Sequence, residues 1–210
     1  MIIEITKDRL NEIKSSKKNK LGSFGGISPL DGKLFKYYCS IEKDFLNRIE
    51  PQLWNLANHQ VDGVALPIDI VYCEDELVGY TQPFFEGIII EDFLKNIKST
   101  DCISVEKYLD SILDKFYLLA QKGISSYDVC ARNMIYSDGE IKLFDCDLYY
   151  FDNSKSEEDL YKESVKNFLY SVDEDCDTIP SFTQSTKERI ITYINAHSYD
   201  AVKKRREAKK

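Results

Sequence analysis

Apolar residues recur at helical spacing in two long stretches of the chain, residues 40–59 and 105–120. Ser104 is expected to cap the second helix and Gly123 to end it. Pro51 interrupts the first stretch, so that helix either kinks there or restarts with the proline in its first turn. The stripes comprise Ile41, Phe45, Ile49, Leu53 and Leu56, and Val105, Leu109, Ile112, Leu113, Phe116, Leu119 and Ala120.

Shorter apolar runs, bounded by turn residues, predict strands in the first half of the chain. The run Gly79–Gly87 passes from a strand into an extended linker, and we expect a domain boundary near residue 86. Strands are expected at 1–5, on both sides of Asp31-Gly32, at 64–73 and at 76–83, and further helices at 7–15, 90–98, 156–172, 185–195 and 199–209.

The pair Asp138-Gly139, set between two apolar runs, predicts a β-hairpin with a two-residue turn. A turn centred between these residues pairs positions whose numbers sum to 277. Asn133 then faces Phe144 and lies beside Asp145, with cross-strand neighbours roughly 5 Å apart. Asp128 is expected on the loop that enters the same end of the hairpin.

These elements predict an α+β fold in two parts. Residues 1–86 are expected to form a small antiparallel β-sheet domain with one long helix. Residues 87–210 are expected to form a mostly helical domain around the hairpin.

Composition favours a folded globule, because 43% of residues are hydrophobic and 12% are aromatic. The N-terminus shows no signal peptide and no window is apolar enough to span a membrane, so we expect a cytoplasmic protein. The scattered cysteines, without C-x-x-C pairs, are expected to be reduced thiols. Only two histidines occur, neither near a nucleophile motif, which disfavours Ser-His-Asp hydrolysis and a His-rich metal centre.

The net charge of −8 is unevenly distributed. The segment 197–210 has six basic and two acidic residues and carries +4, which leaves −12 on the remainder. Because the chain outside residues 197–210 is so acidic, it is not expected to bind nucleic acid stably. The basic tail is interpreted as a solvated helix end, with RNA, an anionic membrane or an acidic partner as alternatives.

The oxygen-bearing side chains of Asp128, Asn133 and Asp145 suit a hard cation such as Mg²⁺. Glycines at 22, 25 and 26 allow backbone to lie close to a phosphate chain, although a glycine-rich hairpin turn explains them equally well. Lys36 shares a strand face with Leu34, where a lysine needs an anion. Lys33 is the alternative phosphate lysine.

The order of these parts resembles the protein kinase-like superfamily over residues 20–170. Its most specific portion is Asp128-Val-Cys-Ala-Arg-Asn133, followed by Asp145. The resemblance implies a two-lobed fold, with ATP and Mg²⁺ as cofactors and a protein substrate as partner. It is closest in type to a minimal, atypical bacterial- or phage-type kinase.

The resemblance also implies a role for each matching residue. Asp128 would act as the base, and Arg132 would neutralise the γ-phosphate. Asn133, Asp145 and Asp147 would hold metal. Lys36 would contact the α- and β-phosphates and pair with Glu50, with Glu42 as the alternative. Gly22, Ser23, Phe24, Gly25 and Gly26 would cover the phosphates, Pro83, Phe84 and Phe85 would line the adenine site, and Asp159 would brace the catalytic loop.

The chain departs from this family at three places. Ser126-Tyr127 stands where the family has His-Arg, and Asp145-Cys146-Asp147 stands where it has Asp-Phe-Gly. Thirteen residues separate Asp145 from Asp159, too few for an activation segment. We therefore expect a minimal kinase acting on Ser, Thr or Tyr hydroxyls, with an aminoglycoside- or choline-type small-molecule kinase and a nucleotide-binding pseudokinase as alternatives.

Overall fold

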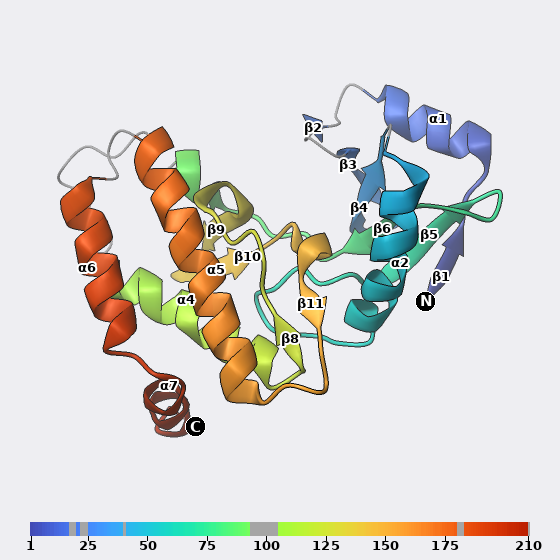
Figure 1. Ribbon diagram of the computed structural model, residues 1–210. Helices are drawn as coiled ribbons and strands as arrows, with labels where there is room; N and C mark the ends of the chain where they lie inside the picture. Colours follow the sequence, from blue (N-terminus) through green and yellow to red (C-terminus); the bar gives the residue numbers. More distant parts are fainter. Residues whose placement is uncertain (17–19, 22–24, 40, 93–104, 180–182, 210) are drawn as a thin grey trace. The chain divides into compact units, whose positions relative to one another are not determined.

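The chain divides into two units in the computed structural model, which describes residues 1–16, 20–21, 25–39, 41–92, 105–179 and 183–209. Unit 1 comprises Met1–Gln60 and Ala65–Phe84, and unit 2 comprises Val61–Val64 and Phe85–Lys210. Both contain helices and strands, so the chain has an α+β fold (Figure 1). The helix expected at 90–98 and its neighbour's cap at Ser104 lie largely outside the described residues.

Unit 1 is built on a six-stranded sheet in the order β1-β5-β6-β4-β3-β2. Neighbouring strands are antiparallel except β1 and β5, which pair in parallel. The expected all-antiparallel sheet is therefore wrong at this edge, because a strand pattern does not determine which neighbour a strand joins. The elements are β1 (Ile2–Glu4), α1 (Lys7–Ser15), β2 (Lys20–Leu21), β3 (Gly25–Leu30), β4 (Lys33–Tyr38), α2 (Lys43–Ala57), β5 (Asp69–Cys73) and β6 (Glu76–Gln82).

Each face of this sheet has its own hydrophobic core. Leu10 and Ile13 of α1 pack with Phe35 and Tyr37 on one face. On the other, Ile49 and Leu53 of α2 pack with Tyr38, Ile70 and Tyr80. Because side chains alternate along a strand, Lys36 lies on the face that α2 covers.

Two helices differ from expectation. Pro51 lies inside α2, which runs as one helix from Lys43 to Ala57 rather than restarting at the proline. The helix expected at 156–172 continues to Thr178. These additional turns carry Asp175 and Thr178, so they add a polar side chain that packs against the loop before β9.

Unit 2 combines helices with short strands. β7 joins the hairpin β9-β10, and β8 pairs with β11. Leu143 N–H of β10 donates to Gly63 O at 2.9 Å, which ties Val61–Val64 to this unit. The elements are β7 (Ile88–Ile89), α4 (Val105–Ala120), β8 (Ile124–Ser125), η1 (Ala131–Asn133), β9 (Met134–Ser137), β10 (Glu140–Leu143), η2 (Cys146–Leu148), β11 (Tyr150–Phe151), α5 (Glu157–Thr178), α6 (Gln184–Asn195) and α7 (Tyr199–Glu207).

Helix α4 forms the centre of unit 2. Its Leu109, Ile112 and Leu113 are fully buried, and Phe116 meets Phe168 of α5 edge-on at 6.0 Å between ring centroids. None of the helices within the described ranges is both long and apolar enough to cross a membrane.

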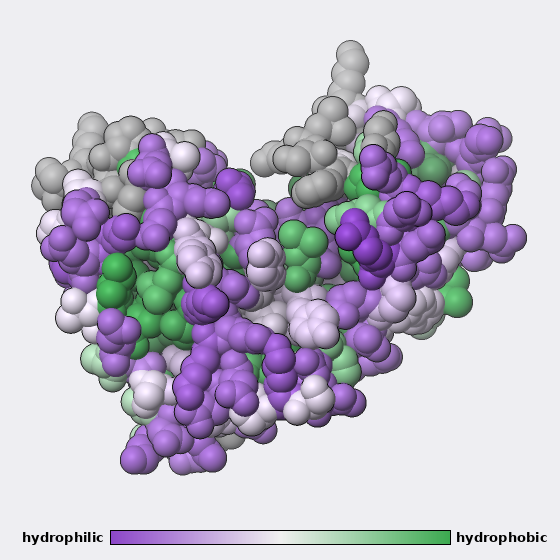
Figure 2. Space-filling model, in the orientation of Figure 1, coloured by the Kyte–Doolittle hydropathy of each residue, from purple (hydrophilic) through white to green (hydrophobic). Residues whose placement is uncertain are grey.

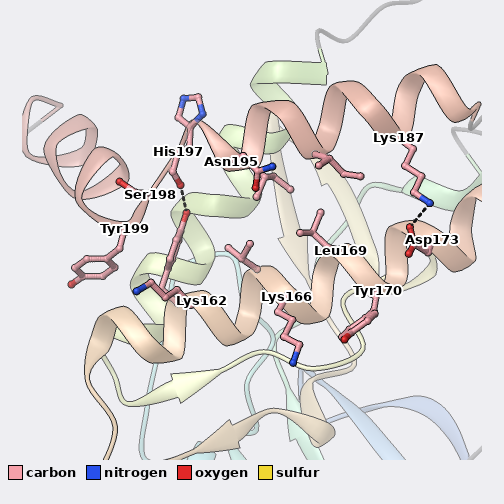
Figure 3. Close-up of a pocket in the computed structure, with 14 residues that line it drawn as sticks. Lys162, Lys166, Leu169, Tyr170, Asp173, Lys187, Asn195, His197, Ser198 and Tyr199 are labelled. Carbon is pink, nitrogen blue, oxygen red and sulfur yellow. Dashed lines mark hydrogen bonds and ion pairs between the residues drawn. The ribbon is translucent and has the colours of Figure 1, made fainter.

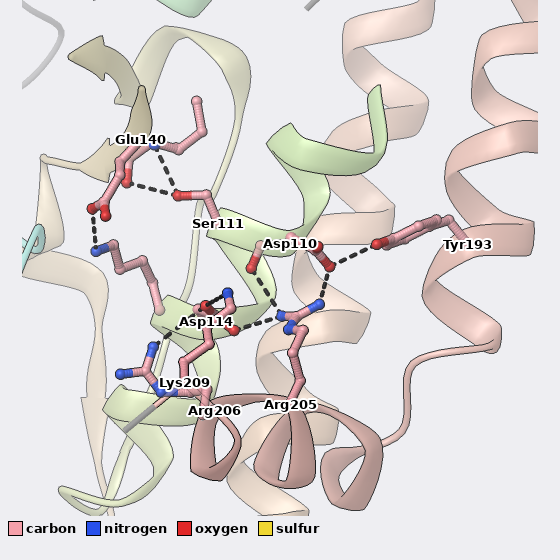
Figure 4. A network of polar contacts seen from close by, with 10 residues as sticks. Asp110, Ser111, Asp114, Glu140, Tyr193, Arg205, Arg206 and Lys209 are labelled. Carbon is pink, nitrogen blue, oxygen red and sulfur yellow. Dashed lines mark hydrogen bonds and ion pairs between the residues drawn. The ribbon is translucent and has the colours of Figure 1, made fainter. Parts of the chain in front are cut away.

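The basic tail was expected to be a solvated helix end. It instead packs onto α4 as helix α7 (Figure 4). Arg205 bonds to Asp110 and, at 2.5 Å, to Asp114. Arg206 and Lys209 approach the same Asp114 at 3.4 and 3.6 Å. Burial raises the pKa of Asp114 even though Lys209 and Arg206 counteract it. Much of the tail's charge is thus neutralised within the unit.

Candidate functional site

The β9-β10 hairpin has the register predicted from its turn. Ser137 pairs with Glu140 and Met134 with Leu143, so the paired numbers sum to 277. Asp138 and Gly139 have φ angles of 54° and 84°, and positive φ at both positions is the requirement of the tight turn that such pairs form. The Phe144 N–H donates to Asn133 O at 3.1 Å, which places Asn133 opposite Phe144.

Asn133 connects the hairpin to the loop that carries Asp128. Its Nδ2 donates to Asp128 O at 2.9 Å and to Asp128 Oδ2 at 3.1 Å. Both side-chain bonds of Asn133 thus use the amide nitrogen, and its Oδ1 has no hydrogen-bond donor among the described residues. An oriented amide oxygen beside a half-exposed carboxylate suits a hard cation.

Asp128 and Asp145 have strained backbones for which no hairpin turn accounts. Six non-glycine residues of the described chain have positive φ, and Asp31, Glu74, Asp75 and Asp138 lie in two-residue hairpin turns. The other two are Asp128 at 52° and Asp145 at 62°. Left-handed backbone costs a non-glycine residue of order 1–3 kcal/mol and clusters at functional sites. Asp128 and Asp145 are therefore candidates for catalytic or metal-binding residues.

The neighbours of Asp128 limit what the loop can do. Arg132 Nη2 lies 3.4 Å from Asp128 Oδ1, and the Cys130 thiol lies 3.7 Å from the same oxygen. Burial, followed by the negative charge of Asp128, raises the pKa of Cys130 to about 12. The thiol is therefore protonated near neutral pH and is no nucleophile.

Helix α5 holds the loop through three polar side chains that sequence reasoning missed. Ser126 N–H donates to Ser164 Oγ at 2.8 Å, and Asn167 Nδ2 donates to Ser126 O at 2.8 Å. Further along, Ala131 N–H donates to Asp175 Oδ2 at 3.0 Å. The spacing of three and then eight residues puts all three on one helix face, and this polar stripe was the available signal.

The resemblance implied that Asp159 braces the loop, but in the structure it does not brace that loop. It is exposed at the start of α5, where its carboxylate accepts from Ser156 Oγ at 2.6 Å and its N–H donates back at 3.1 Å. This reciprocal pair caps the helix.

Burial raises the pKa of Asp175, and the Ala131 N–H and the charge of Arg132 offset part of this increase. The α5 carboxylate that bonds to the loop is thus Asp175, which is partly buried.

In unit 1, Lys36 is buried at 8% exposure, with Nζ 6.0 Å from the centroid of the Tyr80 ring. Glu50, its expected partner, accepts a hydrogen bond from the Tyr72 hydroxyl, which in turn accepts from Trp54 Nε1 at 3.1 Å. Glu42 lies immediately before α2 as its N-cap residue.

Lys33 has a structural partner. Its Nζ lies 2.6 Å from Asp69 Oδ2, which also accepts from Thr81 Oγ1 at 2.7 Å. Burial of Asp69 favours a higher pKa, but the bonds from Lys33 and Thr81 outweigh it and lower the pKa. Lys33 is therefore bonded to a buried carboxylate, and the role of Lys36 as the phosphate lysine stays a prediction.

The glycine-rich segment is described only in part, because Gly22, Ser23 and Phe24 lie outside the described residues. Gly25 and Gly26 belong to β3. A Cβ on Gly25 would lie 1.8 Å from Tyr37 O, and one on Gly26 would lie 2.3 Å from the Tyr37 hydroxyl. Close packing on β4 therefore requires both glycines, whatever else they contact.

The expected adenine-site residues follow β6. Pro83 is half-buried, Phe84 is 60% exposed, and the Phe85 ring lies 5.3 Å from Lys142 Nζ. Gln82, which sequence reasoning passed over, is 3% exposed and its Oε1 has no hydrogen-bond partner in the described part of the chain. It is a spare acceptor at the end of β6.

The two remaining acidic candidates lie at η2. Asp145 is its N-cap residue, and Asp147, within it, is 6% exposed. No group of three or more His, Cys, Asp and Glu residues within the described ranges could hold a metal ion alone. Mg²⁺ commonly binds through one or two carboxylates together with substrate phosphates, so Asn133 Oδ1 and Asp145 fit that donor set.

Comparison of the chain with models of known protein families gave no match, and comparison with curated proteins gave none either.

Proposed function

We propose that this protein is an ATP- and Mg²⁺-dependent phosphotransferase, a minimal protein kinase with a two-lobed kinase-like fold. The observation that carries the proposal is a pair of aspartates with left-handed backbone, Asp128 and Asp145, on either side of a hairpin. Asn133, at the start of that hairpin, is hydrogen-bonded to Asp128. A candidate base on the loop before the hairpin, an amide oxygen at the start of the hairpin and a second carboxylate just after it are the parts that phosphoryl transfer uses.

In the proposed reaction, Asp128 accepts the proton of a Ser, Thr or Tyr hydroxyl while the hydroxyl oxygen forms a bond to the γ-phosphorus of ATP. The bond from that phosphorus to the β,γ-bridging oxygen breaks, and ADP leaves with the electron pair. Lys36 is assigned to the α- and β-phosphates and Arg132 to the γ-phosphate. Asn133 and Asp145, with Asp147 as a second carboxylate, would hold Mg²⁺, which neutralises charge on the phosphates.

A small-molecule phosphotransferase is the second candidate. After η2 the chain enters β11 and then the Ser156 cap of α5, without a segment that could present a peptide. The buried Asp147 gives the Asp-x-Asp arrangement seen in kinases of small alcohols. A nucleotide-binding pseudokinase is the outcome if no transfer occurs.

The decisive experiment incubates cell lysate and Mg²⁺ with γ-labelled ATP and either wild type, Asp128→Asn or Asp145→Asn. Asparagine tolerates left-handed backbone, so both variants keep the fold while losing the carboxylate. We expect labelled proteins with wild type and a loss of about 10²–10⁴-fold in each variant.

Asp138→Asn is the matched control, since Asp138 also has positive φ but lies at the exposed turn. It should transfer label as wild type does. Label appearing only in small metabolites would favour the second candidate. An unlabelled lysate, together with nucleotide-dependent thermal stabilisation, would leave a pseudokinase.

A further inference from the structure

An open groove of about 680 Å³ runs between α5 and α6 in unit 2 (Figure 3). Hydrophobic side chains gather at the surface between these two helices (Figure 2). Val165 and Leu169 of α5 and Ile191 of α6 are only partly buried, and they form its floor with Ile194. Leu169 points into the space between the helices. Such a concave apolar surface marks an interaction site.

Lysines border this groove in an otherwise acidic chain. The charged residues that line it are Lys162, Lys166, Lys187 and Asp173, whereas the whole chain has 36 acidic and 28 basic residues. Lys187 pairs with Asp173 at 2.7 Å, and Lys162 pairs with Glu158 at 2.7 Å. Lys166 is exposed, and its Nζ lies 5.8 Å from the Tyr170 ring centroid, with no carboxylate partner among the described residues.

The lysine border continues beyond the groove. An adjoining hollow of about 410 Å³ shares Lys162 and Lys166 and adds Lys155. Its carboxylates are Asp159 and Glu163, and Glu163 pairs with Lys155 at 2.5 Å. Lys162 and Lys166 are four residues apart on one helix, so they form a row along the groove.

We propose that this groove binds an acidic amphipathic helix of a protein partner. A helix lying along α5 and α6 would bury apolar residues at i, i+3 or i+4, and i+7 on the floor. Carboxylates four residues apart on its edge would match the spacing of Lys162 and Lys166. The site lies within unit 2 and does not depend on phosphoryl transfer.

A second copy of this chain fits less well. A two-fold contact between grooves would bring like-charged lysine rows into one interface, which is unfavourable. The apolar faces of α1 and α2 are already covered by the sheet of unit 1 and cannot supply the helix.

The test measures fluorescence anisotropy of a labelled amphipathic peptide of about 15 residues, long enough for four helical turns. It carries leucines on one face and glutamates at i and i+4 on the adjoining edge, and its analogue has lysines in place of the glutamates. Full-length wild type should bind the acidic peptide saturably and the basic analogue at least about tenfold more weakly. The double variant Lys162→Glu/Lys166→Glu should lose about tenfold in affinity for the acidic peptide.

Lys203→Glu/Lys204→Glu is the matched control, with the same charge reversal at exposed positions of α7, and should bind as wild type. Leu169→Ala should also weaken binding, about fivefold, because it removes part of the floor. Equal binding of both peptides, an unaffected double variant, or no saturation up to about 1 mM peptide would overturn the proposal. So would a concentration-dependent dimer that Leu169→Ala dissociates, which would assign the groove to a second copy.

Discussion

The two lysines of β4 have the same charge and different surroundings. Lys33 bonds to Asp69, a carboxylate with 2% of its side chain exposed, while Lys36 lies beside the Tyr80 ring on the face that α2 covers. A buried carboxylate that loses its partner cannot recover the lost interaction from water. The stability of unit 1 should therefore depend on Lys33, and nucleotide use on Lys36.

Lys33→Met should lower the free energy of unfolding by about 1–3 kcal/mol, because Asp69 would keep Thr81 and the N-terminal ammonium at 3.7 Å but lose its closer ion pair with Lys33. Lys36→Met should leave stability nearly unchanged and abolish nucleotide-dependent thermal stabilisation. Urea denaturation and thermal shifts with Mg-ATP measure the two effects. Normal nucleotide use by Lys36→Met would show that the phosphate lysine is elsewhere.

Asp69 should also determine part of the acid sensitivity of the fold. Its folded-state pKa lies below its ordinary value of 3.8, so its contribution is complete above that pH. The contribution is lost as the pH falls through the lower folded-state pKa, since the unfolded chain then binds the extra proton. Unfolding free energies between about pH 4 and pH 2 should therefore fall less steeply in Asp69→Asn than in wild type. Asp75→Asn, at an exposed turn, is the control.

At the scale of elements, α5 supports the loop that carries Asp128. It bonds to the backbone on both sides of Asp128, through Ser164 and Asn167 at Ser126 and through Asp175 at Ala131. A helix is stiff over this length, so the loop conformation, including the strained Asp128, is imposed by an element outside the loop.

Asp175→Leu should leave the Ala131 N–H unsatisfied and cost about 1–3 kcal/mol of stability. Hydrogen exchange at the Ala131 amide should accelerate, and phosphoryl transfer should fall mainly through kcat. Asp175→Asn keeps an acceptor oxygen and removes a partly buried charge, so it should retain the protection. Equal exchange rates in Asp175→Leu and wild type would show that the loop holds its shape alone.

At the scale of the whole chain, helix α7 packs against α4, which carries Asp110 and Asp114, rather than extending into solvent. Arg205 supplies the closest contacts, with bonds to Asp110 and Asp114 and a further bond from Nη2 to Asp110 O at 3.1 Å. Burial lowers the pKa of Arg205, as expected for a cation withdrawn from water. Part of the positive charge of the tail is therefore used in ion pairs within unit 2.

Arg205→Met should destabilise the protein by about 1–3 kcal/mol, because it leaves Asp110 and Asp114 partly buried with fewer partners. Lys203→Met, on the exposed side of the same helix, should change stability by less than about 0.5 kcal/mol. Calorimetric melting of both variants makes the comparison. Equal melting temperatures would mean that α7 is only loosely attached.

The sequence by itself determined the local geometry of the candidate site. The Asp138-Gly139 turn and the alternation around it specified the register that places Asn133 opposite Phe144, since steric limits on φ and ψ act between adjacent residues. The α+β class and most helices followed from periodicity in the same way, and the α1 bounds were predicted to the residue.

Only the tertiary structure decided which distant side chains meet. Asp175 lies 44 residues from Ala131, Asp69 lies 36 from Lys33, and Arg205 lies 95 from Asp110. Each pairing depends on how helices and strands dock, and many acidic residues could have served equally by local pattern. For this reason the sequence predicts neither the support that Asp175 gives the loop nor the packing of the tail on α4. Local stereochemistry shaped the hairpin, and long-range packing selected the residues that hold it in place.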